Sequence, residues 1–428
     1  MRIIHTADWH LGNRMHGIDR HKESREFLGW LKNLIVEKNA SVLVVAGDIF
    51  DSANPSVEAR RLYYTFLASL ADTCCKNVVI IGGNHDSSVM LDSAKELLEV
   101  LNIRVVGSIN NLSPEQMCFE LKDGAGKETL GICMALPFVR EVELRSILSD
   151  SEKCADGDLY SFTYQKLYSQ VFEAAKKLRS DRNIPIIATG HLYAADLEGR
   201  LAQKKSGEKS DDGVKVLDVL GTLGNVPASV FPPCDYVALG HIHYSSMVAK
   251  NPAIRYSGSP FVMGFDEANM AHHVICADIF CDGEKKLEVE KIKTPETFLY
   301  RRISGTLAEI RDELAGLSNF LETESRPLYL ELCYKRELGI NAQEYLSDSI
   351  SALSENVSVV SWKIADSDKI FSSMGFEGFE AVEIKNLDDR EIFTQLILSK
   401  TGLDAKSEEG KSAIAKFLPL FLEIAGEV

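Results

Sequence analysis

The chain has 428 residues, enough for two or three domains, and its 45% hydrophobic and 26% charged residues are typical of a soluble globular protein. The formal net charge of -16 argues against a free-standing DNA-binding protein, because contacts to phosphate normally need a basic surface. No stretch of sequence approaches the roughly 18 apolar residues of a membrane span. Nine scattered cysteines without a Cys-x-x-Cys spacing predict neither a disulfide framework nor a zinc knuckle, and favour the reducing cytoplasm.

The first part of the chain, about residues 1–280, repeats one design in which an apolar strand ends in Gly, His, Asp or Asn. Strands are expected at 2–7, 41–46, 77–81, 184–189 and 236–239. Helices are expected at 22–37, 57–71, 91–101 and 160–180, and the polar stretch 196–213 is expected to be a surface loop. Nearly continuous apolar strands that alternate with helices indicate an α/β core covered by helices on both faces.

The pattern changes after residue 283. Strands are expected at 297–304, 327–334 and 357–364, separated by helices at 307–317 and 342–354. No His or Asp gathers at these strand ends, so residues 284–375 are expected to form a small α/β accessory (capping) domain. Residues 376–428 are expected to form a C-terminal helical segment with amphipathic helices at 388–401 and 407–425, where Pro419 kinks or shortens the second.

Five strands of the first part, the proposed domain 1–283, end in residues that can bind metal. The endings are Asp8-Trp9-His10, Gly47-Asp48, Gly83-Asn84-His85-Asp86, Gly190-His191 and Gly240-His241-Ile242-His243. In open α/β sheets the carboxyl ends of the strands converge on one crevice, which is where sites form. Any one ending is typical of an ordinary turn, but five in order, each after an apolar strand, favour a functional site.

Carboxylate and imidazole ligands without thiolate suit Mn²⁺, Fe or Zn²⁺ in an open site that also holds water. Seven ligands of the Asp, Asn and His types are too many for a single ion with a vacant position. Two ions bridged by one carboxylate, about 3.5–4 Å apart, account for them and are typical of phosphoryl displacement. The sequence therefore predicts a two-metal phosphoesterase.

The ordered endings resemble those of the calcineurin-like metallophosphoesterases, and the finer resemblance is to the SbcD-type nuclease subunits of bacteria. It covers about residues 1–280 and extends more loosely to the C-terminus. The resemblance implies a β-sandwich flanked by helices, with two Mn²⁺ ions as cofactors and Fe, Mg²⁺ or Zn²⁺ as other options. The segments that carry it are Thr6-Ala7-Asp8-Trp9-His10-Leu11-Gly12, Ala46-Gly47-Asp48-Ile49-Phe50-Asp51, Tyr236-Val237-Ala238-Leu239-Gly240-His241-Ile242-His243 and Tyr256-Ser257-Gly258-Ser259-Pro260.

The resemblance also implies a role for each residue of the site. One ion would be held by Asp8, His10, Asp48 and His243, and the other by Asp48, Asn84, His191 and His241. His85 would face the scissile phosphate and stabilise the transition state or protonate the leaving group, while Asp86 would orient it. Archaeal and eukaryotic relatives commonly carry His where this chain has Asp51, which leaves any second histidine role open.

The partners implied are DNA, an SbcC-like coiled-coil ATPase in a heterotetramer, and a second copy of the nuclease domain. Such an ATPase could supply the basic DNA-binding surface that the charge of -16 argues against here. The apolar stripes of the C-terminal helices would dock on the ATPase or, alternatively, pack on the chain's own accessory domain. Arg14, Arg20 and Lys22 form either a local basic rim for DNA or a solvated loop and helix face.

The function expected is a Mn²⁺-dependent nuclease for duplex ends and for single-stranded or hairpin DNA, working in DNA end processing, repair and recombination in the cytoplasm at the nucleoid. A phosphatase or phosphodiesterase of small nucleotides or phosphoproteins is the alternative. It needs neither the accessory domain nor the C-terminal helices, although the acidic charge suits it slightly better. A non-catalytic scaffold is a third reading, against which the intact set of ligands argues.

Overall fold

The computed structural model describes residues 1–124, 126–148, 159–194, 226–281, 286–321, 324–335, 340–365, 394, 397 and 407–425. The chain forms two compact units: Met1–Arg302 with Glu324–Leu330 and Glu355–Val360, and Ile303–Thr323 with Glu331–Ser354 and Ser361–Val428. No helix in the described ranges is long and apolar enough to cross a membrane. The loop expected at 196–213 and all but two residues of the helix expected at 388–401 lie outside those ranges.

The first unit contains a six-stranded sheet in the order β14-β13-β1-β4-β5-β6. Four of its strands, β1, β4, β5 and β6, are parallel neighbours, whereas β13 is antiparallel to both β1 and β14. The parallel strands are short apolar runs, as expected for strands that are buried on both faces. Their bounds are β1 Arg2–Thr6, β4 Val42–Ala46, β5 Asn77–Ile81, β6 Ile103–Val106, β13 His273–Phe280 and β14 Lys286–Lys293.

A second six-stranded sheet has the order β11-β12-β10-β9-β8-β7. Here β8, β9, β10 and β12 are parallel neighbours, and the antiparallel strands β7 and β11 form the two edges. Their bounds are β7 Cys118–Lys122, β8 Thr129–Met134, β9 Ile186–His191, β10 Tyr236–Gly240, β11 Ser246–Val248 and β12 Asn251–Tyr256.

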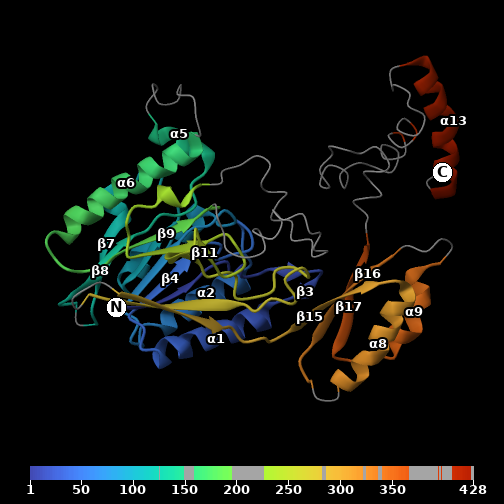
Figure 1. Cartoon of the computed structure of the whole chain (residues 1–428), viewed down its shortest axis with the longest axis horizontal. Helices are drawn as coiled ribbons and strands as arrows, with labels where there is room; N and C mark the ends of the chain where they lie inside the picture. The colour runs from blue at the N-terminus through green and yellow to red at the C-terminus, as the bar shows by residue number, and fades with distance from the viewer. Residues whose placement is uncertain are drawn as a thin grey trace. The chain divides into compact units, whose positions relative to one another are not determined.

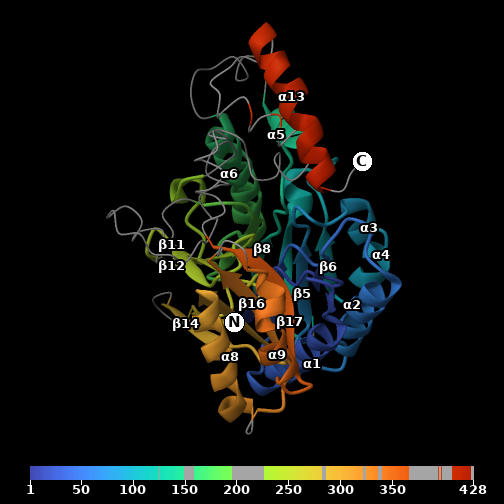
Figure 2. The ribbon, with the colours of Figure 1, turned by 90° about the vertical axis from the view of Figure 1, so that its right-hand side faces the viewer.

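The two sheets pack face to face, and helices cover their outer faces (Figure 2). Small side chains such as Ala46, Cys133 and Ala238 lie in the layer between the sheets. Helices α1 (His21–Glu37) and α2 (Val57–Ser69) cover the first sheet, and α6 (Leu159–Arg179) with the short α5 (Glu141–Ile147) covers the second. The prediction of a β-sandwich flanked by helices is therefore confirmed.

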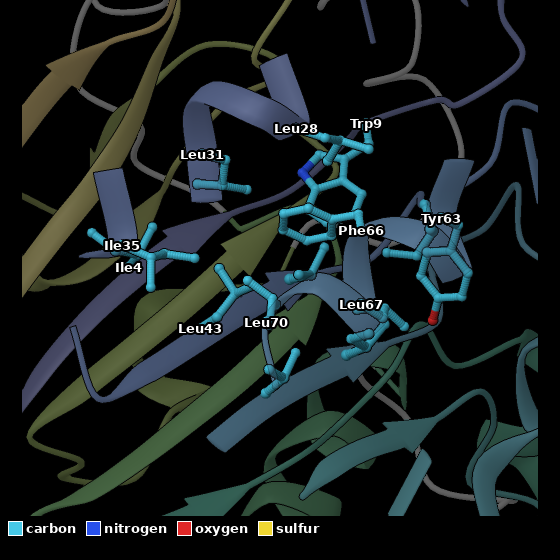
Figure 3. Close-up of a cluster of buried hydrophobic side chains, with 14 of the residues drawn as sticks. Ile4, Trp9, Leu28, Leu31, Ile35, Leu43, Tyr63, Phe66, Leu67 and Leu70 are labelled. Carbon is cyan, nitrogen blue, oxygen red and sulfur yellow. The ribbon is translucent and has the colours of Figure 1, made fainter. Parts of the chain in front are cut away.

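Trp9 anchors the turn after β1 in the core beneath α1 and α2 (Figure 3). Its ring is fully buried and stands edge-on to Phe27 and Phe66, with ring centroids 6.2 and 5.6 Å away. Its Nε1 donates a hydrogen bond to the Thr6 hydroxyl at 3.0 Å. A buried indole with its N–H satisfied strongly fixes the local backbone, so the residues on either side of Trp9 have a defined position.

The helix expected at 91–101 is instead two short helices, α3 (Ser88–Asp92) and α4 (Lys95–Glu99). Ser87 caps α3 by accepting the Met90 N–H, and the Ser93 hydroxyl bonds back to the Met90 carbonyl where α3 ends. Other elements had no prediction because they are short or at an edge. They include the β2–β3 hairpin (Arg14–Met15, Ile18–Asp19) and the 3₁₀ turns at Pro114–Met117 and Ala228–Val230.

The expected accessory pattern is present as β15 (Leu299–Gly305), α8 (Leu307–Leu321), β16 (Leu328–Tyr334), α9 (Ala342–Ser351) and β17 (Val357–Ile364). The three strands form a sheet in that order, and α8 and α9 pack together beside it (Figure 1). Pairing of β14 with β13 keeps the residues just after 283 in the first unit. The C-terminal helix α13 (Glu408–Ala425) continues through Pro419, so it is not shortened there.

Candidate metal centre

The turns after β1 and β4 run side by side and hold three of the predicted ligands. The Asp8 N–H donates to the Gly47 carbonyl and the His10 N–H to the Asp48 carbonyl, each at 3.0 Å. Asp8, His10 and Asp48 have φ angles of 54°, 43° and 50°, in the left-handed region that residues other than glycine rarely adopt. Strained backbone of this kind is typical of functional sites and persists only where the surrounding structure enforces it.

Two glycines let the ends of the two sheets approach closely. A Cβ on Gly240 would overlap the Ala46 carbonyl oxygen, and one on Gly47 would overlap the His191 ring. The close approach allows His191 Nδ1 to bond the Ala46 carbonyl oxygen at 2.8 Å. Ligands from separate sheets can meet only because these positions lack a side chain.

The predicted ligands come together at this point. Asp8, His10 and His243 form one group, and Asp8, Asp48 and His191 another, with the ligand atoms of each group within 4.8 Å of one another. One Asp48 oxygen, Oδ2, lies 3.7 Å from His10 Nε2 and 3.4 Å from His191 Nε2. This carboxylate therefore stands between the two groups, as expected for a bridging ligand.

Asn84 and His241 complete the set. Asn84 Oδ1 lies 3.0 Å from His191 Nε2 and 3.1 Å from His241 Nδ1. The His241 N–H also donates to both oxygens of the Asp8 carboxylate, at 3.0 and 3.2 Å. All seven residues predicted as ligands are thus gathered at the ends of β1, β4, β5, β9 and β10.

Burial and neighbouring carboxylates set the protonation of the four imidazoles. Burial lowers the pKa of His10 and of His241 to about 3, so both rings are neutral at pH 7. Burial acts on His191 and His243 in the same direction, but the carboxylates beside these rings outweigh it and raise each pKa to about 9. A metal ligand must be neutral imidazole, so cation binding at those two rings releases protons.

The residues present fit a divalent cation. Both ring nitrogens of His10 are buried and have no hydrogen-bond partner within the described parts of the chain. In the same residues, no Lys or Arg comes within ion-pair distance of the buried Asp8 or Asp48 carboxylates. Buried anionic oxygens and unpaired imidazole nitrogens together are the donor set of a transition-metal site.

His85 lies beside the cluster but, unlike His10 and His191, it is exposed. Its ring is 4.9 Å from that of His10, and its Nδ1 donates to the Asp51 carbonyl oxygen at 2.9 Å. The contact uses the backbone of Asp51, so it does not depend on the residue type at that position. A ligand atom of the His85 ring also lies within 4.8 Å of ligand atoms of His10 and Asp48, so His85 borders the set of predicted ligands.

The prediction that Asp86 orients His85 is wrong. The Asp86 carboxylate is buried and accepts the backbone N–H groups of Ile49, Phe50 and Gly83, at 3.1, 3.0 and 2.9 Å. It therefore ties the turn after β5 to the turn after β4, because buried backbone N–H groups need an acceptor. Asp86 supports the site and does not touch the reacting groups.

The predicted basic rim loses one member. Arg20 is only 3% exposed and its guanidinium is paired with Glu23 at 2.6 Å, between the rings of Phe261 and Tyr300. A buried, paired guanidinium is not available to DNA phosphate, so a DNA contact by Arg20 is wrong. The side chains of Arg14 and Lys22 are exposed, by 68% and 65%.

The sequence patterns did not predict the contact between Glu267 and His243. Glu267 Oε1 lies 3.3 Å from His243 Nδ1, although Glu267 sits in an irregular segment 24 residues after that histidine. No strand ending or spacing marks it. Only the path of the chain after β12 brings it to the site.

Residues 1–245 match the calcineurin-like phosphoesterase family. The chain is 33% identical to the SbcD subunit of the SbcCD nuclease of Escherichia coli K12 over 363 residues, which are 84% of this chain and 83% of that protein. The SbcD protein of Bacillus subtilis is 31% identical over 65% of this chain and 66% of its own length. The SbcD protein of Staphylococcus saprophyticus is 23% identical over 99% of both chains.

These matches confirm the resemblance inferred from the strand endings, and the last extends it through the accessory and C-terminal parts. The gathered Asp, Asn and His groups are those of a metal-dependent hydrolase of phosphodiester bonds. The chain belongs to the SbcD family of nuclease subunits, within the calcineurin-like phosphoesterases.

Proposed function

We propose that the chain is a Mn²⁺-dependent DNA nuclease that degrades duplex ends and cleaves single-stranded or hairpin DNA. The observation that carries this is the convergence of seven ligand residues around Asp48, with the exposed His85 at their edge. Asp8, His10, Asp48 and His243 would hold one ion, and Asp48, Asn84, His191 and His241 the other. Arg14 and Lys22 remain proposed DNA contacts.

Two ions held there would supply the Lewis acidity that activates a water and neutralises charge on the scissile phosphate. His85, fixed through Nδ1 by the Asp51 carbonyl, presents Nε2 to the substrate. From that position it hydrogen-bonds the phosphate oxygens or protonates the departing sugar oxygen. Asp86 keeps the two turns in register while the substrate binds.

A phosphatase of small substrates is less favoured, because similarity to nuclease subunits extends beyond the first part of the chain into the accessory strands and helices. The direct test is Mn²⁺-dependent cleavage of end-labelled duplex and hairpin DNA by the purified chain, compared with p-nitrophenyl phosphate and cyclic nucleotides. Cleavage of DNA that depends on Mn²⁺ is expected. If the chain hydrolyses only the small esters and does not cleave DNA, the proposal of a nuclease is wrong and the alternative of a small-substrate phosphatase is favoured.

The relatives are named as one subunit of SbcCD, which implies a second subunit, and we propose an SbcC-like ATPase as the partner. Helix α13 carries an apolar stripe in which Phe417 is 41% exposed. Replacing Phe417 and Phe421 with Asp would force charge into a docked interface and abolish co-purification with the ATPase, leaving Mn²⁺-dependent cleavage intact. A large fall in melting temperature with unchanged co-purification would show that the stripe packs on the chain itself.

A homodimer through the first unit is proposed from a second apolar surface. Val89, Leu97 and Val100, on and beside α3 and α4, are 80%, 72% and 79% exposed. Exposed apolar side chains clustered in one segment are typical of an interface. Leu97→Asp should shift the molar mass measured by light scattering from two chains to one, while Val142→Asp, at an 81% exposed position on α5, should not.

A further inference from the structure

His243 differs from the other ligands in how its ring is held. Its side chain is 31% exposed, whereas those of His10 and His191 are 3% and 0% exposed. The surrounding core fixes the orientation of a fully buried ring, but it constrains a ring at the surface much less. His243 therefore needs a specific hydrogen bond to keep one ring nitrogen directed at Asp8 and His10.

Glu267 supplies that bond. Its Oε1 lies 3.3 Å from His243 Nδ1, and its side chain is itself only 15% exposed. With Nδ1 donating to the carboxylate, the lone pair available to a cation is on Nε2. A histidine that binds metal commonly donates its other N–H to a carboxylate, which fixes the ring and makes it a stronger ligand.

Glu267 is also held in place. Its second oxygen, Oε2, accepts the Met263 backbone N–H at 2.7 Å. Arg20 Nη1 lies 3.7 Å from the Met263 sulfur, so the buried Arg20–Glu23 pair adjoins the same segment. The Phe265 ring packs in a buried cluster with Met15. Both oxygens of the Glu267 carboxylate therefore have a hydrogen-bond partner before any cation binds, so cation binding does not have to immobilise this side chain.

We propose that Glu267 is a positioning residue that orients His243 for one of the two ions. The inference rests on the proposed function, because it assumes that His243 binds a cation. It goes beyond it by assigning a role to a residue outside the five strand endings. His191 is oriented differently, through the Ala46 carbonyl, so Glu267 should affect one ion and not the other.

The test is calorimetric titration of the metal-free full-length chain with Mn²⁺. We expect two ions for the unchanged chain. Glu267→Gln keeps the side-chain shape but removes the charge, and should weaken one ion by about 10–100-fold, the usual cost of losing such a partner. The other ion should change by less than about 2-fold, and Glu267→Ala should weaken the first ion further.

Glu331→Gln is the matched control, because Glu331 is a buried carboxylate in β16 that bonds the Ser361 hydroxyl at 2.9 Å. It should bind both ions like the unchanged chain. Melting temperatures measured without metal separate a loss of folding from a loss of affinity. Unchanged affinity for both ions in Glu267→Gln and Glu267→Ala would overturn the role of Glu267 alone. Absence of Mn²⁺ binding by the unchanged chain would instead overturn the metal site itself.

Discussion

The strands of the first unit and the strands of the accessory sheet both alternate with helices. The two regions differ in the partners of their buried carboxylates. In the first unit Asp48 lies at a strand end and its nearest charged or chargeable partners are imidazoles. In the accessory sheet Glu331 lies within β16, where it is fully buried and paired with Lys363 at 3.1 Å. One carboxylate is left for a cation to neutralise, and the other is neutralised by the protein.

The difference shows that alternation of strands and helices does not by itself create a site. The first unit has two sheets whose strand ends meet, and glycines where they meet, so ligands from both sheets reach one point. The accessory part, residues 297–364, has a single three-stranded sheet, and within its described residues no group of His, Cys, Asp or Glu could hold a metal. Convergence of strand ends, and not the strand pattern, decides where the chemistry lies.

The largest expected effect comes from removing the carboxylate between the two ligand groups. Asp48→Ala should abolish nuclease activity, and metal analysis should find that the chain no longer holds two ions, because Asp48 faces both His10 and His191. Glu331→Ala should retain both ions and at least half of the activity. If Asp48→Ala still binds two ions tightly and keeps full turnover, Asp48 does not bridge the ions and does not differ from Glu331 in its role.

The next effect separates chemistry from metal binding. His85→Ala should lower turnover by about 10²–10⁴-fold, the usual range for a general acid–base group. Metal content should stay at two per chain, because all seven proposed ligands are unchanged in this variant. Loss of one ion in His85→Ala, seen by elemental analysis, would make His85 a ligand and rule out its substrate-facing role.

A smaller effect is expected from the carboxylate that ties the turns together. Asp86→Asn replaces an acceptor of three backbone N–H groups with one that accepts fewer, and should lower the free energy of unfolding by about 1–3 kcal/mol. Urea denaturation of the metal-free chain measures this. A loss of turnover with no change in stability would restore the assignment of Asp86 to catalysis.

The smallest effect concerns His5, a buried histidine on β1, the strand before the turn that holds Asp8, which bonds Tyr236 and Leu239 instead of a metal. Burial lowers its pKa from 6.5 to about 3, so the unfolded chain takes up a proton that the folded chain refuses. Its contribution to stability is full above pH 6.5 and falls by about 1.4 kcal/mol per pH unit below it, about 2 kcal/mol by pH 5.

His5→Gln should remove that part of the slope. The free energy of unfolding, measured with chelator between pH 5 and pH 7, should depend less steeply on pH in the variant by about 1.4 kcal/mol per unit below pH 6.5. Equal slopes in the two proteins would mean that His5 is protonated in the folded state. In that case burial would not lower the pKa of His5 as it lowers the pKa of His10.

The sequence alone predicted an α/β core with covering helices, the accessory pattern and the seven residues that gather at the strand ends, while the β-sandwich was implied by the resemblance to the calcineurin-like family. Each of these depends on short-range information: apolar strands, and polar residues placed directly at their ends. The sequence also placed His85 among the residues after a strand end, but its separate role was implied only by the resemblance, and its exposure is known only from the structure.

Only the tertiary structure decided which partner each polar side chain has. Asp86 turned out to bond backbone N–H groups, Arg20 to pair with Glu23 inside the unit, and Glu267 to reach His243 from an irregular segment. These contacts join residues whose meeting depends on the packing of loops and not on a period in the sequence. The end of a strand sets the position of a residue's backbone. Long-range packing and the need to pair buried charge decide which groups its side chain contacts.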